Sequence, residues 1–140
     1  MKLKNLPMAL VVCLILLSTG VFASDISPSV IRFDESPFIA ETVFCEEEQE
    51  LIPEDNDFEI LSYALMSSGK GDRFVLANIK NKSAGQRILR REHLVAIFAD
   101  CSQRHPTNIQ YKFDGGEVIT REINFGNSRF PIIKVVSKIE

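Results

Sequence analysis

The chain has 140 residues, of which 45% are hydrophobic and 25% are charged, and its formal net charge at pH 7 is −3. A chain of this length can bury a core of its own, and its composition excludes a fibrous or disordered protein. Nucleic-acid binding requires a basic surface, so the acidic balance argues against that class of function.

The N-terminus has the layout of a secretory signal peptide. Two lysines within the first four residues precede an apolar run from Met8 to Leu17, and a small-residue cleavage pattern ends at Ala23. This order predicts that residues 1–23 are removed on export. A membrane-spanning helix needs about 20 apolar residues, so a retained anchor is the less favoured alternative. We therefore expect a periplasmic or secreted protein without stable membrane insertion after cleavage.

Two cysteines, Cys45 and Cys101, remain after this cleavage. In an oxidising compartment, an even number of cysteines predicts a disulfide bond. Redox centres usually have a C-x-x-C motif, which this sequence lacks, so two free thiols are the less favoured alternative. Closing the loop between the two cysteines is worth about 4 kcal/mol on the chain-entropy model.

Residues 24–37 are polar and predict an extended leader with one short strand, Val30–Phe33, ahead of a single β domain over residues 38–140. Residues 38–45 are rich in Phe, Ile, Thr and Val, which predicts the first strand of that domain. The acidic stretch from Glu46 to Asp57 has no apolar periodicity, so we expect a loop there.

The segment from Phe58 to Met66 fits two structures. Asp57 is a suitable N-cap for a helix, and three apolar residues of the segment share one helical face. However, a glycine-rich turn at residues 67–72 separates the segment from a second apolar run at residues 74–80. Two apolar runs around such a turn favour a β-hairpin.

The rest of the chain alternates apolar segments with turn residues. Leu94–Ala99 is continuously apolar, which predicts a central strand that is covered on both faces. Residues 109–113 alternate between apolar and polar, as in a half-buried strand. Further strands are predicted over residues 87–89, 117–125 and 130–139, the last with Ile133, Val135 and Ile139 on one face.

Six to eight strands separated by turn residues predict an all-β fold. We expect an antiparallel, immunoglobulin-like β-sandwich, with a small antiparallel β-barrel as the alternative. In the sandwich, the disulfide would join the first strand to the end of the strand at residues 94–99 and could cross between the two sheets.

The sequence contains no recognisable catalytic motif. Its two histidines, His93 and His105, lie near Glu92 and Asp100 but without the spacing of a metal site. The G-x-S-x-G motif of a serine nucleophile is absent. We therefore expect neither enzymatic activity nor a metal or other cofactor.

Two further patterns have simpler explanations. Glu54, Asp55 and Asp57 suggest a loose calcium site, but a solvated acidic loop is favoured because the full calcium-loop pattern is missing. The triplet that begins at Asn81 fits the N-glycosylation pattern, which is common by chance.

Charge is segregated along the chain. Residues 46–59 contain eight acidic and no basic residues, whereas residues 70–91 contain seven basic residues and one acidic residue. A bipolar surface would steer a charged partner, and Arg87, Arg90 and Arg91 form the basic patch at which we would expect it to bind. The favoured alternative is that the two segments lie side by side and neutralise each other.

Together these features favour an exported, non-catalytic binding protein whose partner is another envelope or secreted protein. Binding would use an exposed edge strand or the basic patch. The alternatives are a small barrel that binds an apolar ligand, and an inhibitor or immunity protein that acts on a secreted hydrolase.

Overall fold

The computed structural model describes residues 27–35, 45 and 51–139. The predicted signal peptide, and the predicted strand at residues 38–45 apart from Cys45, lie outside the described residues. The described chain contains one short 3-10 turn, η3 (Arg91–His93), and ten strands. These are β1 (Ile31–Phe33), β2 (Asp55–Asn56), β3 (Phe58–Ser68), β4 (Asp72–Asn81), β5 (Arg87–Arg90), β6 (Leu94–Phe98), β7 (Gln103–Arg104), β8 (Gln110–Phe113), β9 (Val118–Asn127) and β10 (Ile132–Ile139). No helix within these residues has the length and apolar character needed to cross a membrane.

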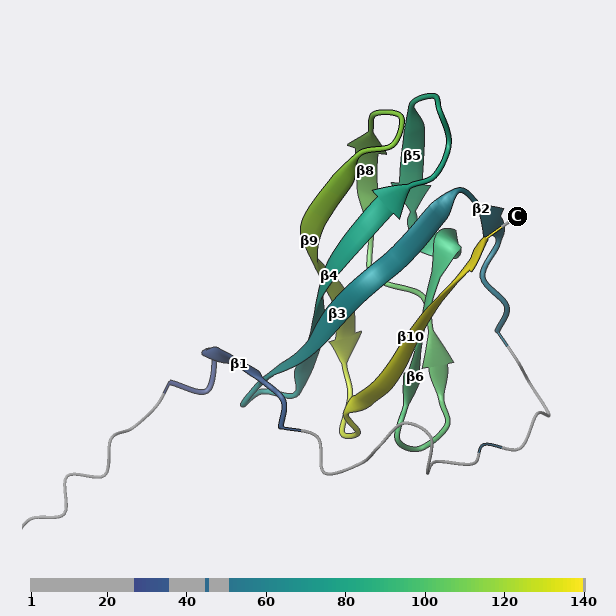
Figure 1. Cartoon of the computed structure of the whole chain (residues 1–140). Helices are drawn as coiled ribbons and strands as arrows, with labels where there is room; N and C mark the ends of the chain where they lie inside the picture. The colour runs from purple at the N-terminus through teal and green to yellow at the C-terminus, as the bar shows by residue number, and fades with distance from the viewer. Residues whose placement is uncertain (1–26, 36–44, 46–50, 140) are drawn as a thin grey trace, which may run out of the picture.

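The first sheet has the strand order β1-β3-β4-β9 and is antiparallel throughout (Figure 1). Strands β3 and β4 form the predicted hairpin, so the strand prediction for residues 58–66 is confirmed. Gly71 permits the turn because its φ of 87° lies in the left-handed region that favours glycine. Ser68 Oγ also accepts a hydrogen bond from the amide of Asp72 and so fixes the turn.

The second sheet has the order β2-β10-β6-β7, and β5 pairs with β8 in a separate two-stranded sheet. One strand pair departs from the expected antiparallel arrangement, because the two residues of β2 run parallel to the end of β10. Strand β6 lies between β10 and β7, and Leu94, Val95 and Ala96 are completely buried. The prediction of a central strand covered on both faces is therefore confirmed.

One apolar core fills the space between the sheets. Val75, Ala77 and Ile79 project into it at alternate positions of β4, with exposed fractions of 0 to 1%. The opposite side is contributed by residues of β5, β6, β8 and β10, among them Leu89 and Phe98. The strand order leaves the sheets open. The sandwich prediction is thus confirmed, and the barrel alternative is wrong.

The side-chain pattern predicted for the last strand is wrong at its beginning. The register of β10 against β6 shifts between Ile132 and Lys134. Such an irregularity changes the simple alternation of a strand. As a result, Ile132 and Val135 join the core cluster, whereas Ile133 is buried outside it.

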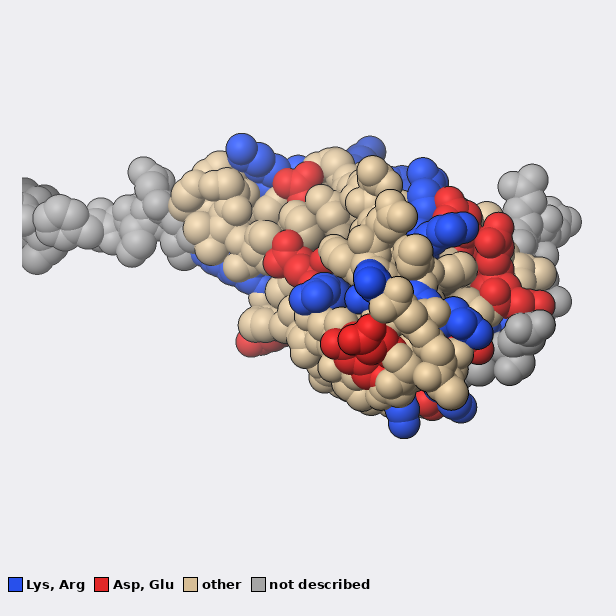
Figure 2. Space-filling view, turned by 90° about the horizontal axis from the view of Figure 1, so that it is seen from above, with Lys and Arg blue, Asp and Glu red and all other residues tan. Residues whose placement is uncertain are grey.

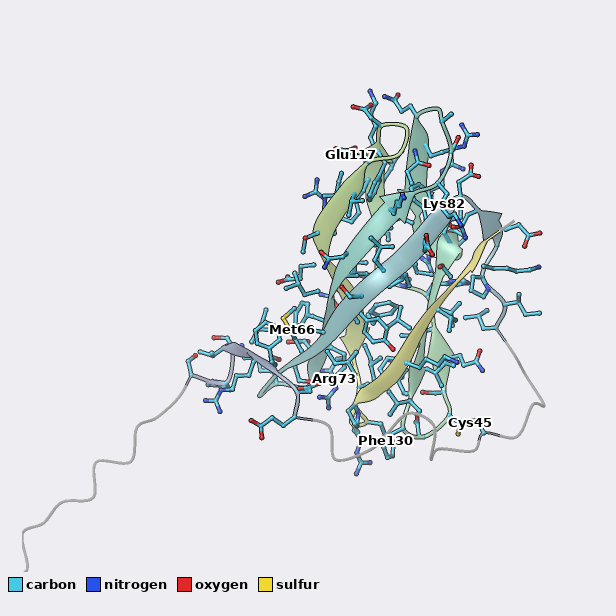
Figure 3. All side chains as sticks on the ribbon, in the orientation of Figure 1. Cys45, Met66, Arg73, Lys82, Glu117 and Phe130 are labelled. Carbon is cyan, nitrogen blue, oxygen red and sulfur yellow. A yellow bond between two sulfur atoms is a disulfide. The ribbon has the colours of Figure 1, made fainter. Side chains whose placement is uncertain are left out.

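The predicted disulfide between Cys45 and Cys101 is present, with 5.5 Å between the two Cα atoms. Cys101 lies in the turn that follows β6, and Figure 3 shows Cys45 at the same end of the sandwich as Phe130. Both cysteines are half-buried, and neither belongs to the core cluster. The disulfide therefore fastens this turn at one end of the sandwich; the strand through which it could cross between the sheets lies outside the described residues.

Candidate functional site

The three arginines of the predicted basic patch lie on β5 and at the start of η3, and all are exposed. Arg87 Nε lies 2.5 Å from Asp57 Oδ2, and Arg91 Nε lies 3.5 Å from Glu92 Oε1. Since two of the three arginines have a carboxylate partner, the patch is less basic than the sequence alone suggests. Partner binding by Arg87, Arg90 and Arg91 stays a prediction.

Two ion pairs join the acidic and basic segments among the described residues. Besides the pair of Arg87 with Asp57, Lys82 Nζ lies 3.9 Å from Glu59 Oε2. From outside the basic segment, Lys138 Nζ lies 2.7 Å from Asp55 Oδ1. Figure 2 shows basic and acidic side chains next to one another on the face it presents. These contacts favour mutual neutralisation over a bipolar surface. They also engage two carboxylates of the loose calcium site, and the described residues hold no cluster of potential metal ligands.

Both histidines make contacts that serve the fold. His93 Nδ1 accepts a hydrogen bond from the amide of Arg90 at 3.2 Å, and its ring stacks on Phe58 with 5.7 Å between the centroids. Burial lowers the pKa of His93 because it disfavours the charged imidazolium. His105 Nδ1 lies 2.9 Å from the carbonyl oxygen of Leu94, to which it donates. Both histidines therefore have a structural role that their contacts explain.

Asn81 has a completely buried side chain at the end of β4. Its Nδ2 donates to the carbonyl oxygens of Gly85 and Asp114, each at 2.8 Å, and its Oδ1 accepts from the amide of Ser83 at 3.0 Å. Asn81 thus joins the β4–β5 connection to the β8–β9 turn. The triplet that fits the glycosylation pattern is therefore explained by this structural role, which the sequence analysis missed.

Two stretches of strand edge have no pairing strand among the described residues, one on β3 and one on β10, where β2 pairs only with Lys138 and Ile139. β1 pairs with β3 only from Met66 to Ser68, and the amide of Asp34 donates to the carbonyl of Leu65 at 2.8 Å. Beyond that point, no described strand pairs with β3 on this side. We call the unpaired stretch, Glu59–Ala64, the open edge; β10 lies close to β3 without pairing with it (Figure 1).

The open edge exposes apolar side chains. Tyr63 pairs with the core residue Ala77 and therefore faces the inner side of the sheet, yet it is 38% exposed. Leu61 is the additional residue at the register shift between Ile60 and Ser62 and is 50% exposed. No charged side chain occurs from Ile60 to Ser68.

The backbone of the open edge is also oriented for pairing. In an antiparallel ladder, successive residues direct their amide and carbonyl groups to alternate sides. Leu65 directs its carbonyl toward β1, where Asp34 binds it. Tyr63, two residues away without an intervening register shift, therefore directs its amide and carbonyl toward the open edge.

The edge of the first sheet at β9 and the edge of the second sheet at β7 are protected. At β9, the amide of Thr107 donates to the carbonyl of Asn124 at 2.8 Å. Arg121 pairs with Ala77, so it points inward, and its guanidinium carbon lies 5.4 Å from the centre of the Tyr111 ring. Strand β7 spans only two residues, one of them the exposed Arg104. Inward-pointing charges, covering segments and short charged strands all prevent strand addition.

An apolar row on the outer face borders the open edge. Phe33, Met66 and Phe74 occupy matching positions on β1, β3 and β4. Phe33 is 64% exposed, whereas Met66 is 7% exposed. Figure 3 shows Met66 near the end of β3 that lies beside β1. An extended segment bound to the open edge would therefore end next to apolar surface.

Comparison with protein-family models, curated proteins and solved structures finds no match to this chain. The fold and the site thus define a general class, an all-β sandwich with a disulfide and an open strand edge. Because a fold alone does not specify a function, the function is argued from the geometry of this edge.

Proposed function

We propose that the protein is an exported, non-catalytic binding protein whose partner is another protein that adds an extended segment to the open edge of β3. The open edge carries this proposal, because it has no charged residue after Glu59 and is apolar at Leu61 and Tyr63. Long apolar edges pair with other chains unless they are protected. Strand addition of this kind is a common mode of peptide recognition.

The packing of the core supports a protein partner over a small apolar ligand. Four aromatic side chains of the core have exposed fractions of only 0 to 2%, and these are Phe58, Phe98, Phe113 and Phe125. Phe58 and Phe113 pack edge to face, with 5.1 Å between their ring centres. The aromatic residues that could line a ligand cavity are therefore used to fill the core.

Export is supported by the disulfide together with the N-terminal sequence pattern. A disulfide between Cys45 and Cys101 is compatible with an oxidising compartment outside the cytoplasm. An inhibitor or immunity protein would be a particular case of the same binding function, with a secreted hydrolase as the partner.

Photo-crosslinking in intact cells tests the proposal. A photoreactive amino acid replaces Ser62, an exposed residue of the open edge, in the full-length chain. We expect a discrete adduct with one protein, identified by mass spectrometry. The matched control carries the same probe at Val118, which is 52% exposed on β9, and should give no such adduct.

A charge placed on the open edge provides the second part of this test. Leu61→Lys should lower the yield of the Ser62 adduct at least fivefold, because an edge lysine opposes strand addition. Val118→Lys adds the same charge on β9 and should leave the yield unchanged. Equal adducts from both probe positions would contradict the proposal. Loss of the adduct only on replacing Arg87, Arg90 and Arg91 with Ser would move the binding site to the basic patch.

A further inference from the structure

Strand β1 is weakly held in the first sheet. All three of its side chains are exposed, Ile31 by 38% and Phe33 by 64%. Hydrophobic stabilisation scales with the apolar area that is removed from water. β1 therefore gains little of it, in contrast to β4, whose alternate residues are completely buried.

Polar contacts supply most of what holds β1 in place. Its ladder with β3 spans three residue pairs. At one end, the Asp34 carboxylate accepts a hydrogen bond from Ser67 Oγ at 2.8 Å. At the other end, the amide of Lys70 donates to the carbonyl of Pro28 at 3.1 Å. Another extended chain can replace the main-chain bonds of the ladder one for one.

We propose that β1 is a displaceable strand, which covers one end of the β3 edge until the extended segment of the partner replaces it. This inference rests on the proposed function. Displacement would lengthen the binding site from Glu59–Ala64 to Glu59–Ser68. It would also uncover Met66, which is only 7% exposed while β1 is in place. The partner would thus bury apolar surface that β1 covers only in part.

The lengthened edge specifies the chemistry of the partner segment. Because Ile60–Ser68 carries no charge, a charged residue opposite it would lose hydration without gaining an ion pair. Antiparallel pairing is expected, since it is the more stable arrangement and the one that β1 already uses. The occupant is therefore an extended, uncharged segment of another protein that runs antiparallel to β3.

Hydrogen exchange tests displacement before the partner is known. Leu65 and Ser67 direct their main-chain groups toward β1, whereas Ala64 and Met66 direct theirs toward β4. If β1 detaches while the hairpin stays folded, the amide of Ser67 should exchange at least tenfold faster than those of Ala64 and Met66. Equal exchange at these three amides would overturn the proposal.

A disulfide lock tests whether binding requires displacement. Phe33 and Met66 are directly opposite each other, at a position suited to a cross-strand disulfide. The oxidised Phe33→Cys, Met66→Cys variant should lower the yield of the Ser62 adduct at least tenfold. The matched Phe33→Ser, Met66→Ser variant cannot lock and loses only the apolar contact of Met66, so it should lower the yield less than threefold.

The outcomes separate this inference from the proposed function. An unchanged adduct in the locked variant, together with its loss in Leu61→Lys, would refute displacement and leave the proposed function standing. An adduct that neither variant reduces would contradict both. An adduct between two copies of the chain would overturn the assignment of the edge to another protein.

Discussion

The two edges of the first sheet differ in how they meet solvent, although β3 and β9 are similar in length and pair with the same strand, β4. On β9, the position that pairs with Ala77 holds Arg121. On β3, the corresponding position holds Tyr63. A buried row of the same sheet thus ends in an inward-pointing charge on one side and in a half-exposed aromatic ring on the other.

This difference shows that the open edge is not a general consequence of the fold. The sandwich protects β9 with Arg121 and with hydrogen bonds from Thr107 and Tyr111, at the cost of one buried Arg121 nitrogen without a partner. Among the residues that the structure describes, the open edge has no inward-pointing charge or hydrogen-bonded cover of that kind, although its register shift at Leu61 is an irregularity of the type that weakens strand addition. The difference between the two edges fits a site for a particular segment on β3, and three substitutions test this interpretation.

The largest expected effect follows from removing the side-chain hydrogen bonds of Asn81, the last residue of β4. Asn81→Ala removes three hydrogen bonds, two of them to the carbonyl groups of Gly85 and Asp114. Because each hydrogen bond is worth about 1 kcal/mol, we expect the free energy of unfolding to fall by about 3 kcal/mol. Urea denaturation measures this change. The control Asn78→Ala removes two exposed side-chain hydrogen bonds and should cost about 1 kcal/mol, at about 0.5 kcal/mol per bond. Equal losses would contradict the role assigned to Asn81.

Much of this contrast could not be predicted from the sequence. The two apolar runs around the glycine-rich turn were sufficient for the hairpin, and the succession of strands and turn residues was sufficient for the sandwich class. Sequence alternation also places Arg121 on the same face as Ile119 and Ile123, but it does not show that Tyr111 from another sheet covers it. Partners far apart in the sequence are decided by packing, so the roles of Asn81 and of the open edge emerge only in three dimensions.

Predictions of site residues from the sequence were limited for the same reason, because spatial contacts decide their outcome. Charge counting identified Arg87, Arg90 and Arg91, but it cannot reveal that Asp57 and Glu92 lie beside two of them. The alternating pattern of the last strand failed where β10 shifts its register at Ile132. The cysteine pair was predictable because its argument depends on number and compartment rather than on geometry.

An intermediate effect is expected when the inward-pointing charge of β9 is replaced by an apolar side chain, as on the open edge. Arg121→Leu removes the inward charge of β9 and its unpartnered nitrogen, so we expect a gain of about 1 kcal/mol in the free energy of unfolding. The same variant should self-associate, as seen by light scattering, because the protection of β9 is weakened. Arg121→Lys retains the charge and should stay monomeric under the same conditions. If Arg121→Leu also stays monomeric, inward charge is not what protects β9.

The smallest expected effect concerns the start of the open edge. His93 stacks on Phe58, the first residue of β3, and burial lowers the pKa of His93 from its ordinary value of 6.5. The unfolded chain therefore binds a proton more readily than the folded protein, so this part of the stability is complete above pH 6.5 and is lost as the pH falls below it. Thermal unfolding should show a smaller decrease in Tm below pH 6.5 for His93→Asn than for the parent protein. The control His105→Asn should retain the parental decrease. An unchanged decrease in His93→Asn would mean that other groups set the pH dependence, and that protonation of His93 does not act on the start of the open edge.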